Sequence, residues 1–154
     1  MKLFVTGANG FIGSATVESA LERGHHVSAL VRASSDRSRL PWAEHPNVEI
    51  VEGDVRSPAA WASALDGIDV VLHLAAVFGD FFDQFAVTVV GTERLLAAME
   101  AAKVGRMVLV STFSNYDYRA SASGSVLDES TPLEASPDQR DGYTQTKLFQ
   151  ERIT

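Results

Sequence analysis

The sequence predicts an α/β fold built on a doubly wound parallel sheet, and three observations support this prediction. Short apolar runs recur along the 154 residues, helical patterns alternate with them, and a glycine-rich stretch follows the first run. Strands that alternate with helices pair in parallel through right-handed crossovers, and the expected strand order is 3-2-1-4-5. The apolar runs are Leu3–Val5, Val27–Val31, Val48–Val51, Val70–Leu74 and Met107–Val110.

The helical patterns lie between these runs. The first spans Phe11–Arg23, where apolar residues recur at helical spacing. A short pattern spans Pro58–Leu65, with Ser57 as its expected N-cap. The longest covers Phe82–Ala102 and is rich in residues that favour helix. In contrast, Tyr116–Gly142 is crowded with Ser, Asp, Pro and Gly, which predicts a loop-rich region.

The composition indicates one acidic domain covering residues 1–154. The net charge of −7 argues against a nucleic-acid partner and against binding to an anionic membrane. The chain has no cysteine, which excludes disulfides and thiolate chemistry, and we assign no metal ligands. No stretch has the pattern of a signal peptide or a membrane span, so we expect a cytoplasmic protein.

The glycine-rich stretch "TGANGFIG" lies in the turn from the first strand into the first helix. Glycine permits a tight turn and a close approach of the backbone to a pyrophosphate, which free N–H groups at a helix N-terminus bind. The stretch therefore predicts a Rossmann-type cofactor site, and the alternative is a tight turn without a ligand. The residues assigned to this site are Gly7, Asn9, Gly10, Phe11, Ile12 and Gly13.

The spacing T-G-x-x-G-x-x-G resembles that of the short-chain dehydrogenase/reductase superfamily. The stretch is similar to that of its extended branch, which includes epimerases, dehydratases and dihydroflavonol-reductase-like proteins. Further motifs follow in the family's order: Asp-Val at residues 54–55, "HLAA" at 73–76 and Y-x-x-x-K at 143–147. The resemblance covers essentially the whole chain and implies an NAD(P)-binding Rossmann domain.

The end of the second strand, "ALVRASSDR", bears on the choice between NADP and NAD. NAD-selective sites usually place an acidic residue on the ribose 2′-hydroxyl. The resemblance puts that position at or beside Val31, which Arg32 follows. A guanidinium pairs with a 2′-phosphate, so we predict NADP, with NAD as the second choice. The alternative is that Arg32 and Arg37 are solvated loop residues, since Asp36 is nearby.

The third and fourth strand ends carry two more elements of the resemblance. It implies that Asp54 and Val55 contact the adenine, although Asp also favours turns before helices. We predict that His73 is a hydrogen-bonded core residue and not a catalyst, because it lies in an apolar strand. The following stretch, Phe78–Phe85, lines either a substrate pocket or a contact with the long helix. Small residues beside the cofactor's ribose and phosphates are expected in the segment Leu74, Ala75 and Ala76.

Tyr143 and Lys147 are the expected acid–base pair. Residues four apart share one face of a helix, and an ammonium beside a phenol stabilises the phenolate. The resemblance also implies that both residues lie at the cofactor, where Lys147 holds the ribose. The hydroxyl that orients the substrate oxygen aligns with Thr112, preceded by Ser111, and Ser114 is a poorer candidate.

The chain departs from the family pattern at three places. Thr88 stands where an asparagine usually holds a water and the lysine, so a relay there would use the threonine hydroxyl. Thr112 replaces the commoner serine. The sequence stops shortly after the tyrosine motif, whereas relatives continue, so we expect a C-terminally incomplete domain whose substrate-binding part is absent.

The resemblance implies an NAD(P)-dependent oxidoreductase that transfers hydride between the cofactor and a carbonyl or alcohol carbon of a small molecule. One alternative is a nucleotide-sugar epimerase or dehydratase with tightly held NAD. An alternative from another class is a cofactor-sensing protein without turnover. We further expect a homodimer through the tyrosine helix, where Phe149 and Ile153 share a face, and no turnover by these 154 residues alone.

Overall fold

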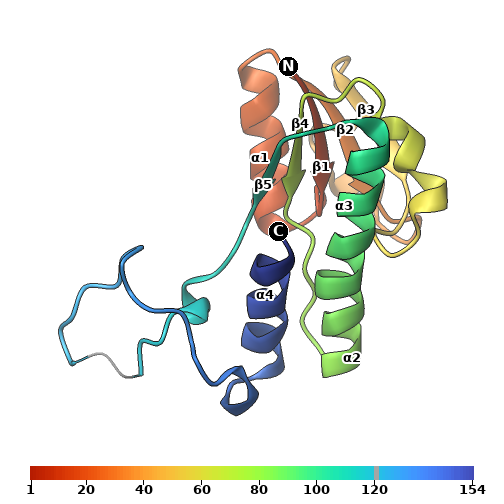
Figure 1. The fold of residues 1–154 in the computed structure, drawn as a ribbon. Coiled ribbons are helices and arrows are strands. Elements are labelled where there is room, and N and C mark those ends of the chain that lie inside the picture. Colours follow the sequence, from red (N-terminus) through yellow and green to blue (C-terminus); the bar gives the residue numbers. More distant parts are fainter. Residues whose placement is uncertain (120–121) are drawn as a thin grey trace.

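The computed structural model describes residues 1–119 and 122–154, which contain a five-stranded parallel sheet (Figure 1). Its strand order, β3-β2-β1-β4-β5, confirms the predicted order. The strands coincide closely with the predicted apolar runs. They are β1 (Lys2–Thr6), β2 (His26–Val31), β3 (Val48–Glu52), β4 (Val70–His73) and β5 (Met107–Leu109).

The parallel register gathers the carboxyl ends of the strands at one edge of the sheet. Thr6, the last residue of β1, lies opposite Leu30 on β2 and opposite His73 on β4. Loops that leave these ends therefore start close together, and in doubly wound sheets this edge holds the ligand.

Two apolar cores cover the two faces of the sheet. α1 (Phe11–Glu22) packs on the face to which Leu3 and Val5 point, and α3 (Gly91–Ala102) covers the face to which Phe4 points (Figure 1). Successive side chains of a strand point to opposite faces, so an apolar run without alternation fits a strand that is buried on both sides.

The second predicted helix is instead two short 3₁₀ helices, Pro58–Ala60 and Ala62–Leu65. Trp61 separates them with φ −138°, and its buried indole Nε1 donates a hydrogen bond of 2.7 Å to the carbonyl oxygen of Asp54. Ser57 occupies the predicted N-cap position, but its side chain makes no capping bond. Burial of the indole thus overrides the local preference for one continuous helix.

The long predicted helix, Phe82–Ala102, is interrupted in its middle. α2 (Phe81–Gln84) leads into a π-helical segment, Phe85–Val90, and then into α3. Beside this segment lies α4 (Gly142–Ile153), which carries the predicted tyrosine and lysine (Figure 1). π-helical turns inside α-helices occur frequently at functional sites, and this one lies next to the helix that bears the predicted acid–base pair.

The loop-rich region extends away from the sheet and connects β5 to α4 (Figure 1). Its described part is anchored by a single β-bridge between Tyr116 and Leu133 and by a cluster around Glu134. The carboxylate of Glu134 accepts hydrogen bonds from Arg140 at 2.7 Å and from Arg119 at 3.2 Å. The bond from Arg140 is the main cause that lowers the pKa of Glu134 to about 2.

Candidate cofactor and catalytic site

The glycine turn between β1 and α1 is closely packed. Gly7 has φ +68°, and a Cβ there would lie 2.8 Å from the Ala75 nitrogen. A Cβ on Gly13 would overlap the carbonyl oxygen of Gly7. Gly10 is less crowded, with a Cβ position 3.2 Å from that oxygen, and it begins α1 without a side-chain cap. Gly7 and Gly13 are thus required by the turn itself, whereas Gly10 leaves the helix N-terminus open to a ligand.

A cavity of about 220 Å³ opens beside this turn at the carboxyl edge of the sheet. Leu30, Gly53, Val77 and Val87 also line it, although the sequence did not indicate them. Their signal is weak, because each is a small or apolar residue near a strand end or in a helical segment. The residues that were predicted to bind cofactor and that line the cavity are Gly7, Asn9, Gly10, Arg32, Asp54, Val55, Leu74, Ala75 and Ala76.

Six residues predicted to bind the cofactor do not line this cavity: Phe11, Ile12, Gly13, Thr88, Tyr143 and Lys147. The side chain of Phe11 is 97 % exposed, and that of Ile12 is 55 % exposed. Gly13 packs under Gly7, and Thr88 is buried in the π-helical segment with a hydroxyl that has no partner among the described residues. A cofactor in the cavity would meet the first turn of α1 through backbone N–H groups, which carry the positive end of the helix dipole.

The basic residues after β2 differ in how they are engaged. Arg37 forms an ion pair with Glu52 at the end of β3. Asp36 accepts a hydrogen bond of 2.6 Å from the hydroxyl of Ser38 and one of 3.1 Å from the Ser38 backbone nitrogen. These two bonds lower the pKa of Asp36. Arg32 lines the cavity, and within residues 1–119 and 122–154 its guanidinium forms no ion pair. Arg32 is therefore the cation that a ligand in the cavity would meet.

Asp54 is oriented by the arginine two residues further on. Its Oδ1 accepts from the Nε of Arg56 at 2.9 Å, and its Oδ2 accepts from Nη2 at 2.8 Å. This hydrogen bonding is the main cause that lowers the pKa of Asp54, against the opposing effect of burial. Val55 is buried against Gly91, where a Cβ would lie 2.8 Å from the valine Cγ1. The start of α3 thus sits directly against the floor of the cavity.

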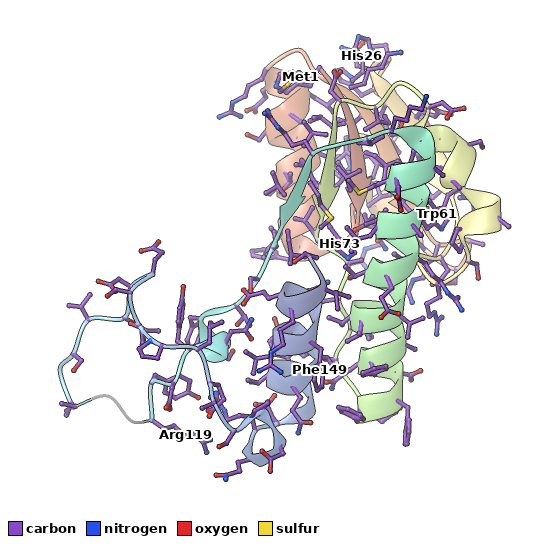
Figure 2. The ribbon with its side chains drawn as sticks, in the orientation of Figure 1. Met1, His26, Trp61, His73, Arg119 and Phe149 are labelled. Atoms are coloured by element: carbon purple, nitrogen blue, oxygen red, sulfur yellow. The ribbon has the colours of Figure 1, made fainter. Side chains whose placement is uncertain are left out.

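His73 is a buried, hydrogen-bonded residue at the end of β4, which confirms its predicted position in the core (Figure 2). Its Nδ1 lies 2.6 Å from the hydroxyl of Thr6, and its Nε2 lies 2.8 Å from the hydroxyl of Thr92. Burial, with a smaller contribution from the charge of Lys147, lowers the pKa of His73 to about 3. The imidazole is therefore neutral at physiological pH.

Tyr143 and Lys147 lie on successive turns of α4. Asp141 caps this helix through a bond of 3.0 Å to the Thr144 nitrogen. The ring of Tyr143 stacks on Phe78, which follows β4, with centroids 4.9 Å apart. Six residues further along α4 lies Phe149 (Figure 2), whose ring contacts Phe85 of the π-helical segment with centroids 6.3 Å apart.

Only 3 % of the surface of Lys147 is exposed, which is unusual for a lysine. Its Nζ donates a hydrogen bond of 2.6 Å to the carbonyl oxygen of Val110, just after β5, and a second bond to Oε1 of Gln150. Burial lowers the pKa of Lys147 to about 8, while the charge of Glu151 acts in the opposite direction. The lysine is thus held at the carboxyl edge of the sheet, and its pKa lies close to physiological pH.

The hydroxyls after β5 are engaged locally. Ser111 donates to a carboxylate oxygen of Glu151 and accepts from the side-chain nitrogen of Asn115 at 3.1 Å. Thr112 Oγ1 lies 2.8 Å from the hydroxyl of Ser114, the poorer candidate of the sequence prediction. Among the described residues, none of these hydrogen bonds reaches the phenol of Tyr143. The geometry therefore brings Lys147 to the strand end but does not choose between Ser111 and Thr112.

This fold and site define a class: a Rossmann-type nucleotide-binding domain with a Tyr–Lys pair at the edge of its sheet. The model of a family described as NAD(P)H-binding matches residues 7–147. The chain belongs to this NAD(P)H-binding family, as the resemblance implied, and its homologues are extended short-chain dehydrogenases/reductases and epimerases.

Two curated bacterial proteins illustrate the relationship. The chain is 37 % identical to a 3 beta-hydroxysteroid dehydrogenase/Delta 5-->4-isomerase of Mycobacterium tuberculosis, over 99 % of this chain and 41 % of that protein. It is 36 % identical to a 2-alkyl-3-oxoalkanoate reductase of Stenotrophomonas maltophilia, over 73 % of this chain and 33 % of that protein. The chain thus spans less than half the length of these relatives.

A solved structure shows the same arrangement of elements. It is the UDP-glucose 4-epimerase of Bifidobacterium longum in complex with NAD+ and UDP, with a TM-score of 0.83 and 25 % identity. The match covers 99 % of this chain and 48 % of the epimerase chain. In the part of the chain that the structure describes, no helix has both the length and the apolar character needed to cross a membrane.

Proposed function

We propose that this chain is the cofactor-binding part of an NADP-dependent oxidoreductase that acts on the carbonyl or alcohol group of a small molecule. The observation that carries the proposal is the buried Lys147, one turn from Tyr143, hydrogen-bonded to the carbonyl of Val110 at the sheet edge that also holds the glycine turn. A lysine that has no binding or catalytic task is seldom buried in this way.

The residues present fit a dinucleotide. Gly7 and Gly10 line the cavity with backbone, and the uncapped N-terminus of α1 suits a pyrophosphate. Asp54 and Val55 also line the cavity and would contact the adenine, and Arg32, which lines it too, would bind a 2′-phosphate. When bound, the nicotinamide exchanges hydride with the substrate carbon.

The chain's own residues would then handle the proton. The phenol of Tyr143 would donate a proton to the substrate oxygen during reduction and accept one during oxidation. The ammonium of Lys147 would stabilise the phenolate and bind the ribose. The hydroxyl of Ser111 or Thr112 would orient the same substrate oxygen, after release from its local partner.

Reduction or oxidation is favoured over epimerisation for two reasons. The curated relatives described above are named as a dehydrogenase/isomerase and a reductase. In addition, Phe78 is 77 % exposed while it stacks on Tyr143, so an apolar surface lies directly beside the proposed acid–base group. A sensor without turnover would not need a buried lysine next to a tyrosine.

The preference for NADP rests on Arg32 and is tested by cofactor titration. We expect Arg32→Ala to weaken NADPH binding by about 10-fold or more, because a charge-assisted bond to the 2′-phosphate is lost. NADH binding should change little. The matched control is Arg37→Ala, since Arg37 is already paired with Glu52.

Fluorescence titration of each variant with NADPH and NADH measures these affinities. If the unmodified chain binds the two cofactors equally, or if both arginine variants behave alike, the preference for NADP is wrong. If it binds neither cofactor, the proposed function itself is wrong.

We further propose a cytoplasmic homodimer in which this chain forms the N-terminal part of a longer subunit. The coverage of the relatives supports the longer subunit, and the absence of cysteine is compatible with the location. The surface proposed for this association is the face of α4 that carries Phe149 and Ile153, both of which are half-buried in this chain. We expect sedimentation of the full-length protein to give twice the subunit mass, and a monomer at micromolar concentration would contradict the dimer.

A further inference from the structure

A chain of buried polar side chains extends inward from Lys147. Gln150, on the same helix, accepts a bond from Nζ of Lys147 and donates its amide to Thr92 Oγ1 of α3 at 2.8 Å. Thr92 in turn contacts His73 of β4, which contacts Thr6 of β1. All five side chains are nearly or fully buried. The chain of contacts therefore links the predicted lysine to α3 and to two strands of the sheet.

The hydrogen-bond directions in this chain follow from the hydroxyl of Thr92. It donates its single proton to the carbonyl oxygen of Thr88 at 2.6 Å. Its oxygen must then accept from both remaining neighbours, the amide of Gln150 and the Nε2–H of His73. Nδ1 of His73 is left to accept from the hydroxyl of Thr6.

These directions fix the side-chain amide of Gln150. Because its nitrogen must face Thr92, its carbonyl oxygen faces Lys147. A flipped amide would point N–H groups at an ammonium and a carbonyl at an oxygen without a free proton, and both contacts would be repulsive. The buried network thus presents a rigid acceptor to the lysine from within the protein.

The same contacts leave one donor of the lysine unused. An ammonium has three N–H donors, of which Val110 and Gln150 take two. Within the described residues the third N–H has no hydrogen-bond acceptor. The two acceptors, which belong to Val110 and Gln150, fix the orientation of the lysine ammonium and therefore the direction of its third N–H.

We propose that Gln150 is a positioning residue: held by Thr92 and His73, it orients the ammonium of Lys147 so that one N–H remains for Tyr143 and the bound cofactor. The proposal rests on the proposed function for what this donor contacts. The orientation of the lysine by Gln150 is a property of the chain itself.

The test uses the titration of Lys147, which needs no cofactor. The chain has three lysines, Lys2, Lys103 and Lys147, so an NMR spectrum of lysine labelled with ¹³C at Cε contains three side-chain signals. The titratable groups that interact with Lys147 through their charge are Glu151 and His73, and His73 stays neutral over the relevant range. Tyr143 lies one turn away on the same helix. The buried lysine is expected to titrate near pH 8.

Two variants at residue 150 should move this titration in opposite directions. Gln150→Leu removes an acceptor that stabilises the charged amine, so the midpoint should fall by about one unit or more. Gln150→Glu places a carboxylate against the ammonium, so the midpoint should rise by about one unit or more. Gln145→Leu is the matched control, because Gln145 lies on the same helix and bonds the carbonyl of Arg140 at 2.8 Å. It should leave the midpoint unchanged.

Turnover in the full-length protein supplies the second measurement. The basic limb of its pH profile should shift in the same direction as the lysine midpoint in each variant, and kcat should fall more than KM rises. Gln150→Met, which keeps the length of the side chain and removes the acceptor, keeps the test decisive if Gln150→Leu does not fold.

An unchanged midpoint in a folded Gln150 variant would overturn the proposal. A shifted midpoint with an unaltered pH profile would equally refute a role in catalysis. Failure of the unmodified chain to bind NADPH would instead refute the proposed function, while the lysine titration would still decide whether Gln150 orients the amine.

Discussion

Replacing Tyr143 by phenylalanine should reduce turnover by about 10²–10⁴-fold, the usual contribution of a positioned general acid or base. The change removes one hydroxyl and keeps the ring that stacks on Phe78, so the fold should survive. Cofactor affinity should change little, because the pyrophosphate and adenosine portions would lie at the glycine turn and the cavity and not at the phenol.

The measurement is NADPH oxidation or NADP reduction by the full-length protein. Suitable probes are a 2-alkyl-3-oxoalkanoate and a 3β-hydroxysteroid, the compounds named for two relatives. Tyr116→Phe is the matched control, since Tyr116 lies in the β-bridge with Leu133. Turnover by Tyr143→Phe at the rate of the unmodified protein would show that the acid–base assignment is wrong.

The second large effect is expected at the glycine turn. Gly13→Ala should destabilise the fold by about 3 kcal/mol or more, because the added Cβ overlaps the Gly7 carbonyl oxygen and only backbone movement relieves the clash. Gly10→Ala should cost about 1 kcal/mol or less, since its φ of −79° suits alanine, and should mainly weaken cofactor binding. Gly13→Ala would thus act mainly on the free energy of unfolding, and Gly10→Ala mainly on cofactor affinity.

Urea unfolding and NADPH titration of both variants check this expectation. Gly105→Ala is the control, because a Cβ there would meet no atom within 4 Å. A Gly13→Ala protein as stable as the control would mean that the close approach of α1 to the turn is wrong. A Gly10→Ala protein with unchanged affinity would mean that the cofactor does not approach this backbone closely.

The strands, the glycine turn and the burial of His73 could be predicted from the sequence, because each of these local patterns is compatible with few structures. The apolar runs are short and rich in valine, which favours buried strands over helices, and a strand followed by glycine and then a helix permits few turns. His73 was also predictable, because a histidine inside an apolar strand must satisfy its ring nitrogens within the core.

The features that sequence reasoning missed depend on contacts between distant elements. The break at Trp61 arises because its indole enters the core and bonds the Asp54 carbonyl, which local propensity does not register. The contact of Gln150 with Thr92 joins residues that are 58 positions apart. In the sequence, Gln150 near Lys147 indicates a solvent-exposed helix face. Only the position of α3 beside α4 shows that this face is buried.

The hydrogen bonds around Thr92 use every available donor, and this has an evolutionary consequence. Every donor of Thr92 and His73 already has an acceptor, so a substitution at either position strands a buried polar atom elsewhere in the core. Changes at Thr92, Gln150 and His73 should therefore be strongly epistatic. Descendants of this sequence would exchange these residues together or not at all, while the exposed loop residues nearby drift one at a time.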